Sequence, residues 1–104
     1  MDDNPIERLL TVLPAEIDMP EATLVRTLVR HTPGRMQAGN AQAAQRLVDA
    51  VTTLAKRAEE ARLPLALPAR MAANRLAAAH HTQVLAWMRA TTLPPPITPQ
   101  SEAT

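Results

Sequence analysis

Two adjacent histidines, His80 and His81, are the clustered titratable side chains whose type best suits metal binding or proton transfer. Two ligands on one helical face need a separation of three or four residues, whereas helical neighbours point about 100° apart. No carboxylate lies within residues 68–90 around this pair, and His31 is remote in sequence. We therefore expect no metal site in this protein.

The side chains used for catalysis are as sparse as those for metal binding. Glu59 and Glu60 are adjacent, so they diverge around a helix and cannot flank a substrate. The chain has no cysteine, two glycines and one serine, Ser101, so it lacks the usual nucleophiles and phosphate-binding loops. We expect a protein that is not an enzyme, with no catalytic residue, no cofactor and no small-molecule substrate.

The composition indicates that helices must supply the whole framework. The 104 residues suffice for one core, and 46% are hydrophobic, but Trp87 is the only aromatic. Alanine, the best helix former, is abundant, which favours an all-α fold. The start resembles no signal peptide and no apolar run approaches 18 residues, so we expect a cytoplasmic protein of bacterial type that does not enter a membrane.

Prolines divide the chain into four expected helices, because each removes a backbone donor and disfavours helix at the preceding residue. The first two begin at 4–7 and 18–21, where Asn or Asp, Pro and Glu form capping sequences. Pro33 and Gly34 should end the second helix, and the third begins either directly after Pro33 or near Asn40. The prediction is a small all-α four-helix bundle with a long hairpin of residues 36–62 and 68–91. Residues 1–92 form the single domain, and 93–104 a proline-rich, disordered tail.

The third segment carries an apolar stripe with spacings of three and four residues. Its mate is either the fourth helix or a second copy of the chain. Because the core has few large side chains, we expect this seam to serve as an interface as well. The function indicated is a protein–protein interaction module, such as an adaptor, chaperone-like protein or regulatory subunit, that binds another protein or itself as a homodimer. The expected partner-binding residues are Leu47, Val51, Leu54, Ala58 and Trp87.

Uneven charge gives rise to an alternative function. Residues 1–21 hold six acids against one arginine, a net −5, whereas residues 22–57 hold six basic residues against one aspartate, a net +5. Either the acidic segment covers the basic one, or the basic segment binds an anionic partner. Residues 9–35 align with a helix-turn-helix, although Pro14 interrupts its first helix and Met19 replaces the usual turn glycine. The alternative is thus a dimeric DNA-binding regulator that uses residues 21–35, contacting nucleic acid through Thr23, Arg26, Thr27, Arg30 and Arg35.

Overall fold

A computed structural model of the chain describes residues 4–13, 18–40 and 42–91. Within these ranges the chain forms helices and no strand, which confirms the all-α prediction. The described helices are α1 (Pro5–Val12), α2 (Pro20–Gln37), α3 (Gln42–Glu60), α4 (Ala66–Ala78) and α5 (His81–Ala90).

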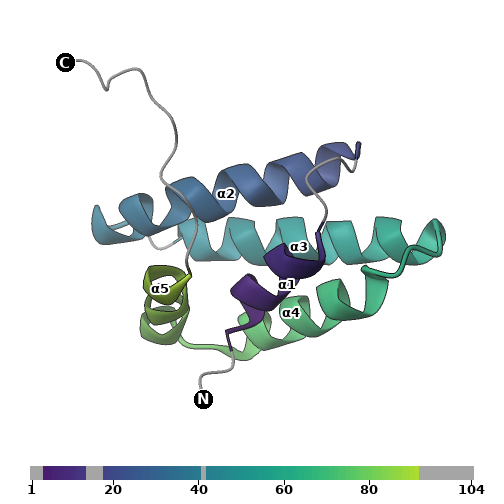
Figure 1. The fold of residues 1–104 in the computed structure, drawn as a ribbon. Coiled ribbons are helices and arrows are strands. Elements are labelled where there is room, and N and C mark those ends of the chain that lie inside the picture. Colours follow the sequence, from purple (N-terminus) through teal and green to yellow (C-terminus); the bar gives the residue numbers. More distant parts are fainter. Residues whose placement is uncertain (1–3, 14–17, 41, 92–104) are drawn as a thin grey trace.

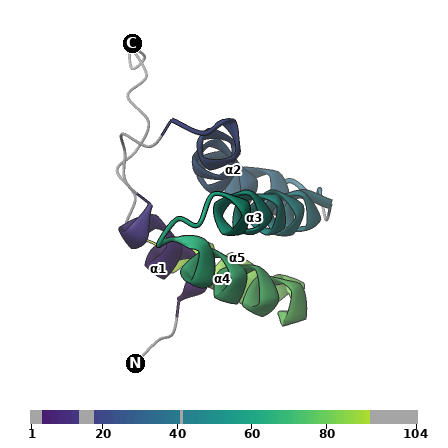
Figure 2. The same cartoon turned by 90° about the vertical axis from the view of Figure 1, so that its right-hand side faces the viewer.

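Three long helices form a layer in which each runs opposite to its neighbour, in the order α2, α3, α4 (Figure 1). The view along this layer in Figure 2 shows α3 between the other two, with α1 beside α4. Helix α5 runs across the end of the layer, where it contacts α2 and α1. The central helix, α3, therefore has neighbours of the same chain on two sides.

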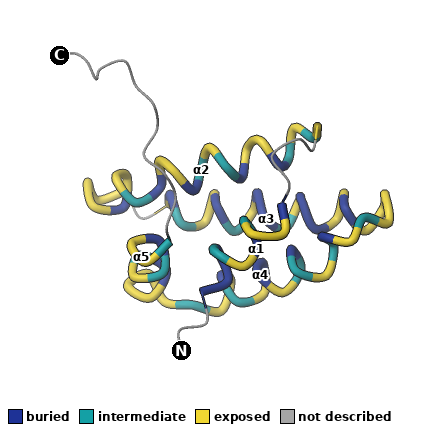
Figure 3. The backbone as a smooth tube through the Cα atoms, in the orientation of Figure 1, coloured by how far each residue is buried: buried dark blue, intermediate teal, exposed yellow. Residues whose placement is uncertain are grey.

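The core follows from this central position of α3. Buried positions recur along its whole length, as the dark blue bands of Figure 3 show. Eight of the 21 buried hydrophobic residues of the described chain are alanines. Small side chains let helix backbones approach closely, which is how a chain with one aromatic residue fills its interior. The buried residues of α3 are Ala43, Leu47, Ala50, Val51, Leu54, Ala55 and Ala58.

The expected end of the second helix at residues 32–34 is wrong, because α2 continues through Pro33 to Gln37. A proline within a helix removes a single backbone donor, and the following turns still close. Here Ala38 N–H donates to the Gly34 carbonyl at 3.0 Å, and Gly39 ends the helix with a φ of +97°. Only glycine adopts that conformation readily, so Gly39 is the true stop signal. Of the two expected starts for the third helix, the later one, near Asn40, is correct.

The expected fourth helix, residues 68–91, is two helices that break at Ala79 and His80. Both residues adopt extended backbone conformations, with ψ angles of 151° and 158°. The break turns α5 toward α2 and α1, which buries Val84 and Met88. The hairpin therefore pairs residues 42–60 with 66–78, and the bundle has five helices in its described part rather than four. The expected proline-rich tail, 93–104, lies outside the described residues.

Candidate functional site

The apolar seam of α3 lies inside the molecule. Leu47, Leu54 and Ala58 are fully buried, and Val51 is only 1% exposed. The chain's own α2 and α4 cover the two sides of α3. Within one chain, the apolar stripe of α3 therefore packs against these two helices. Four of the five expected partner-binding residues are thus core residues that are not exposed on the surface of the chain. A candidate binding surface must therefore consist of other residues.

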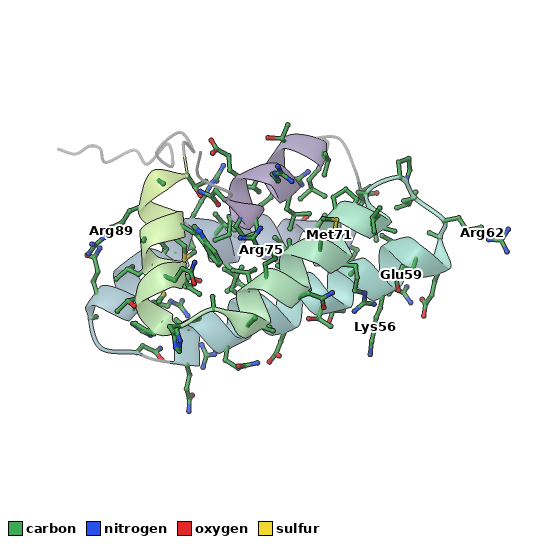
Figure 4. All side chains as sticks on the ribbon, turned by 90° about the horizontal axis from the view of Figure 1, so that it is seen from below. Lys56, Glu59, Arg62, Met71, Arg75 and Arg89 are labelled. Carbon is green, nitrogen blue, oxygen red and sulfur yellow. The ribbon has the colours of Figure 1, made fainter. Side chains whose placement is uncertain are left out.

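An exposed apolar groove, about 370 Å³ in volume, lies between α1 and α4. Three of the four large hydrophobic side chains exposed in the described chain line it: Val12 at 41%, Leu67 at 67% and Met71 at 49%. Figure 4 shows Met71 on the side of α4 that faces α1. We call this surface the α1–α4 groove; it is lined by Pro5, Arg8, Thr11, Val12, Leu67, Pro68, Met71, Ala72 and Arg75.

Asn4 positions the α1 side of the groove. Its side-chain oxygen accepts hydrogen bonds from the Ile6 and Glu7 N–H groups, both at 3.0 Å, which caps α1. Its amide nitrogen donates to the Trp87 carbonyl at 2.9 Å and to the Thr91 hydroxyl at 3.1 Å, which ties α1 to α5. Ile6 and Leu9 are buried beneath α1, and the adjacent side of the same helix lines the groove with Pro5, Arg8, Thr11 and Val12.

The α4 side is fixed by packing and by one exposed ion pair. Ala69 and Ala73 are buried, and Leu67 and Met71 lie on the other side of the same helix. The Arg70 guanidinium donates two hydrogen bonds to the Glu59 carboxylate of α3, at 3.0 and 2.9 Å. These hydrogen bonds lower the pKa of Glu59 below its usual value and raise the pKa of Arg70.

Two arginines line the groove. Arg8 lies on α1 and Arg75 on α4, and the Arg75 guanidinium carbon lies 5.7 Å from the centre of the Trp87 ring. This is a cation–π contact. Trp87, the fifth expected partner-binding residue, makes this contact with Arg75. Trp87 also supplies the carbonyl bound by Asn4, so Arg75 lies toward α5. None of the described lining residues is a carboxylate.

The residues of the DNA-binding alternative lie on the outer side of α2. Thr23, Thr27, Arg30 and Arg35 are exposed and Arg26 is half-buried. The Thr27 hydroxyl donates to the Thr23 carbonyl at 2.9 Å. In a helix-turn-helix the first helix packs against the recognition helix, but here the main neighbours of α1 are α4 and α5.

One ion pair bears on the charge asymmetry. Glu21, from the acidic N-terminal stretch, lies 3.4 Å from the guanidinium of Arg57, from the basic stretch. The acidic and basic segments therefore meet within the chain at this point. This contact is one form of the internal pairing that the charge distribution suggested.

The three histidines lie apart from the groove lining. His31 is on α2, His80 precedes α5 and His81 begins it, and all three are exposed. Over residues 4–13, 18–40 and 42–91, no three His, Asp or Glu side chains group closely enough to hold a metal ion. In the same part of the chain, no helix combines the length and apolarity needed to cross a membrane.

Sequence reasoning missed the groove because it ranked the stripe on residues 44–61 above short apolar pairs. The available signal was Leu67 and Met71, two large apolar residues four positions apart on the side of their helix opposite Ala69 and Ala73. The sequence does not indicate that Leu67 and Met71 share a groove with α1, because that depends on how α1 packs against α4 in the folded chain. Comparisons with protein-family models, curated proteins and solved structures find no match, so the site's own chemistry carries the functional argument.

Proposed function

We propose that this protein is a non-enzymatic interaction module, of the adaptor or regulatory kind, that binds another protein through the α1–α4 groove. The observation that carries the proposal is the gathering of Val12, Leu67 and Met71 on one surface. Isolated exposed apolar residues are ordinary on protein surfaces, but adjacent ones in a concave site are typical of binding sites. Docking would remove these side chains from water, which is the main favourable contribution to association.

The size of the groove suits a short segment of a partner. Helix α1 has eight residues, and Leu67 and Arg75 are eight residues apart on α4. At a rise of 1.5 Å per residue each wall is about 12 Å long, or roughly two helical turns. A partner would therefore insert two or three apolar side chains at helical spacing, as in other helix-in-groove complexes.

A peptide selection with matched variants tests this proposal. A displayed library of 12-residue peptides is selected on the full chain, and the recovered peptides are titrated against Met71→Ser and Leu24→Ser. The side chains of Met71 and Leu24 are both 49% exposed, but Leu24 is on α2 and lines a pocket between α2 and α3, outside the groove. Fully burying an exposed methionine stabilises a complex by about 1.5–3 kcal/mol, and about half of the Met71 surface is already buried, so Met71→Ser should weaken binding roughly three- to tenfold. Leu24→Ser should leave binding unchanged. A selection that returns no Met71-dependent peptide would refute the proposal.

A second candidate function, duplex DNA binding by α2, is favoured by the outward placement of Thr23, Thr27 and Arg30. Anisotropy titrations of a labelled duplex at several salt concentrations test it. Submicromolar affinity that falls steeply with salt and is weakened by Arg30→Ala would support this function. Absence of binding at low salt would eliminate it.

A further inference from the structure

We propose that the outer face shared by α2 and α3 binds a second copy of this chain, so that the protein forms a two-fold symmetric homodimer. The proposal goes beyond the α1–α4 groove, because it concerns a different face and a different partner. It follows from the exposed leucines of this face, from the order of its charges, and from one two-fold axis that matches both.

A second exposed groove, about 450 Å³ in volume, lies between α2 and α3. Leu24 in this groove is the one large exposed hydrophobic side chain of the described chain that lies outside the α1–α4 groove. Lys56, on the same side of α3 as Asp49, points away from α1 in Figure 4, so the groove lies on the opposite side of the helix layer from α1. We call this surface the α2–α3 face; its lining includes Glu21, Leu24, Leu28, Arg46, Asp49 and Thr53.

The α3 side of this face carries one cation and one anion side by side. Arg46 and Asp49 are both exposed and lie three residues apart. Oδ1 of Asp49 accepts from the Gln45 amide at 3.0 Å, and a carboxylate has further lone pairs that a guanidinium can use. A partner that matches this face must therefore carry both signs of charge.

A two-fold axis that lies in the interface, perpendicular to the helices, pairs these groups. Such an axis lays α2 over α2 of the second copy and α3 over its α3, both antiparallel. Midway between Leu24 and Leu28, the axis brings each leucine over the other leucine of the second copy. Midway between Arg46 and Asp49, it brings each charge over the opposite charge of the second copy.

One axis passes through both midpoints, because they lie beside each other in the chain. The groove is lined by positions 21–28 of α2 and 46–53 of α3, so its middle is near position 25 on α2 and 49–50 on α3. The axis crosses α2 at position 26 and α3 between positions 47 and 48. Since the two helices run in opposite directions, both crossings are displaced toward the same end of the groove. The same axis brings Glu21 over His31 of the second copy, which is an exposed imidazole.

Other occupants match the α2–α3 face less well. A nucleic acid would bring phosphates against Glu21 and Asp49, and a wholly acidic or basic segment would meet like charge on one residue of each pair. The area is that of a weak dimer. Because α2 begins six residues before the axis, it overlaps its copy over about 13 residues, or about 20 Å. Two helices about 10 Å apart then bury roughly 800 Å² in total, which is typical of a reversible association. We expect a dissociation constant on the order of 100 µM.

Sedimentation equilibrium of the full chain between about 10 µM and 1 mM tests the proposal. The average mass should rise with concentration from 11.3 kDa toward twice that value. Leu24→Ser should weaken the dimer about tenfold, because the two-fold axis removes the leucine contact twice. The matched control is Met71→Ser, which changes an equally exposed side chain of the α1–α4 groove and should leave the dimer unchanged.

Charge reversal tests the pairing itself. Arg46→Asp and Asp49→Arg should each weaken the dimer about tenfold, since each places like charges opposite one another at both pairs. An equimolar mixture of these two variants should dimerise again, because every pair then joins opposite charges. The control is Arg89→Asp, an exposed residue of α5 outside this face, which should have no effect.

The far-ultraviolet circular dichroism of each variant shows that it is folded. A chain that stays monomeric at about 1 mM would overturn the proposal. A dimer that is insensitive to Leu24→Ser and Arg46→Asp, or a variant mixture that fails to associate, would overturn it as well. None of these outcomes bears on the peptide selection, which reports on the α1–α4 groove.

Discussion

The side chain of Asn4 joins the two ends of the described fold, and replacing it with alanine is the sharpest test of how α1 is held. Asn4 is 6% exposed and makes four hydrogen bonds through its amide group. The oxygen caps α1, and the nitrogen binds the Trp87 carbonyl and the Thr91 hydroxyl at the end of α5. Asn4→Ala removes the cap and both cross-links in one step.

The expected loss follows from these contacts. Removing an asparagine cap costs about 1 kcal/mol of stability. Each donated hydrogen bond contributes about 1 kcal/mol, and the partly buried Trp87 carbonyl loses this partner. We expect Asn4→Ala to lower the free energy of unfolding by about 3 kcal/mol, a large part of the roughly 5–15 kcal/mol typical of a domain.

Equilibrium unfolding in urea measures this loss, with the fluorescence of Trp87 as the signal because it is the only tryptophan. The matched control is Asn40→Ala. The Asn40 side-chain oxygen accepts from the Gln42 N–H at 3.1 Å, so that variant loses a cap at an exposed position. We expect Asn40→Ala to cost about 1 kcal/mol. Equal losses for the two variants would show that the link between α1 and α5 contributes nothing.

Three further changes test the core, a buried hydroxyl and the exposed ion pair. Leu54→Ala should lower the free energy of unfolding by about 2–5 kcal/mol, since Leu54 is fully buried; a loss below about 1 kcal/mol would contradict its place in the core. Thr32→Val should stabilise the fold by about 1 kcal/mol in the same urea assay, because the buried Thr32 hydroxyl has no hydrogen-bond partner among the described residues. The pKa of Glu59 is lowered on folding, so its contribution is present above its usual pKa of 4.5 and is lost as the pH falls through the lower value. The difference between the urea midpoints of wild type and Glu59→Gln should therefore be present at about pH 7 and shrink as the pH falls below 4.5; a difference that does not shrink in acid would refute the pairing with Arg70.

Local sequence signals predicted the helix type and several boundaries. Asn4 and Pro5 start α1, because capping chemistry depends on neighbouring residues alone. Pro20 is the first residue of α2, but the expected cap from Asp18 is wrong, because Met19 is the N-cap residue and no side chain caps this helix. The predicted helix end at Pro33 was wrong because the effect of a proline depends on whether tertiary packing holds the flanking turns. Here Val29 and Met36, on either side of Pro33, are buried. The break at His80 was missed because no proline or glycine marks it; the burial of Val84 and Met88 accompanies it.

The sequence by itself determined that this chain is helical and that one helix carries an apolar stripe through Leu47, Val51 and Leu54. These properties follow from composition and from a periodicity that any helix shares. Only the tertiary structure decided that the stripe is core and that the exposed apolar surface lies between α1 and α4. A stripe becomes core or interface according to how many helices of the same chain cover it, and that depends on contacts between residues far apart in sequence.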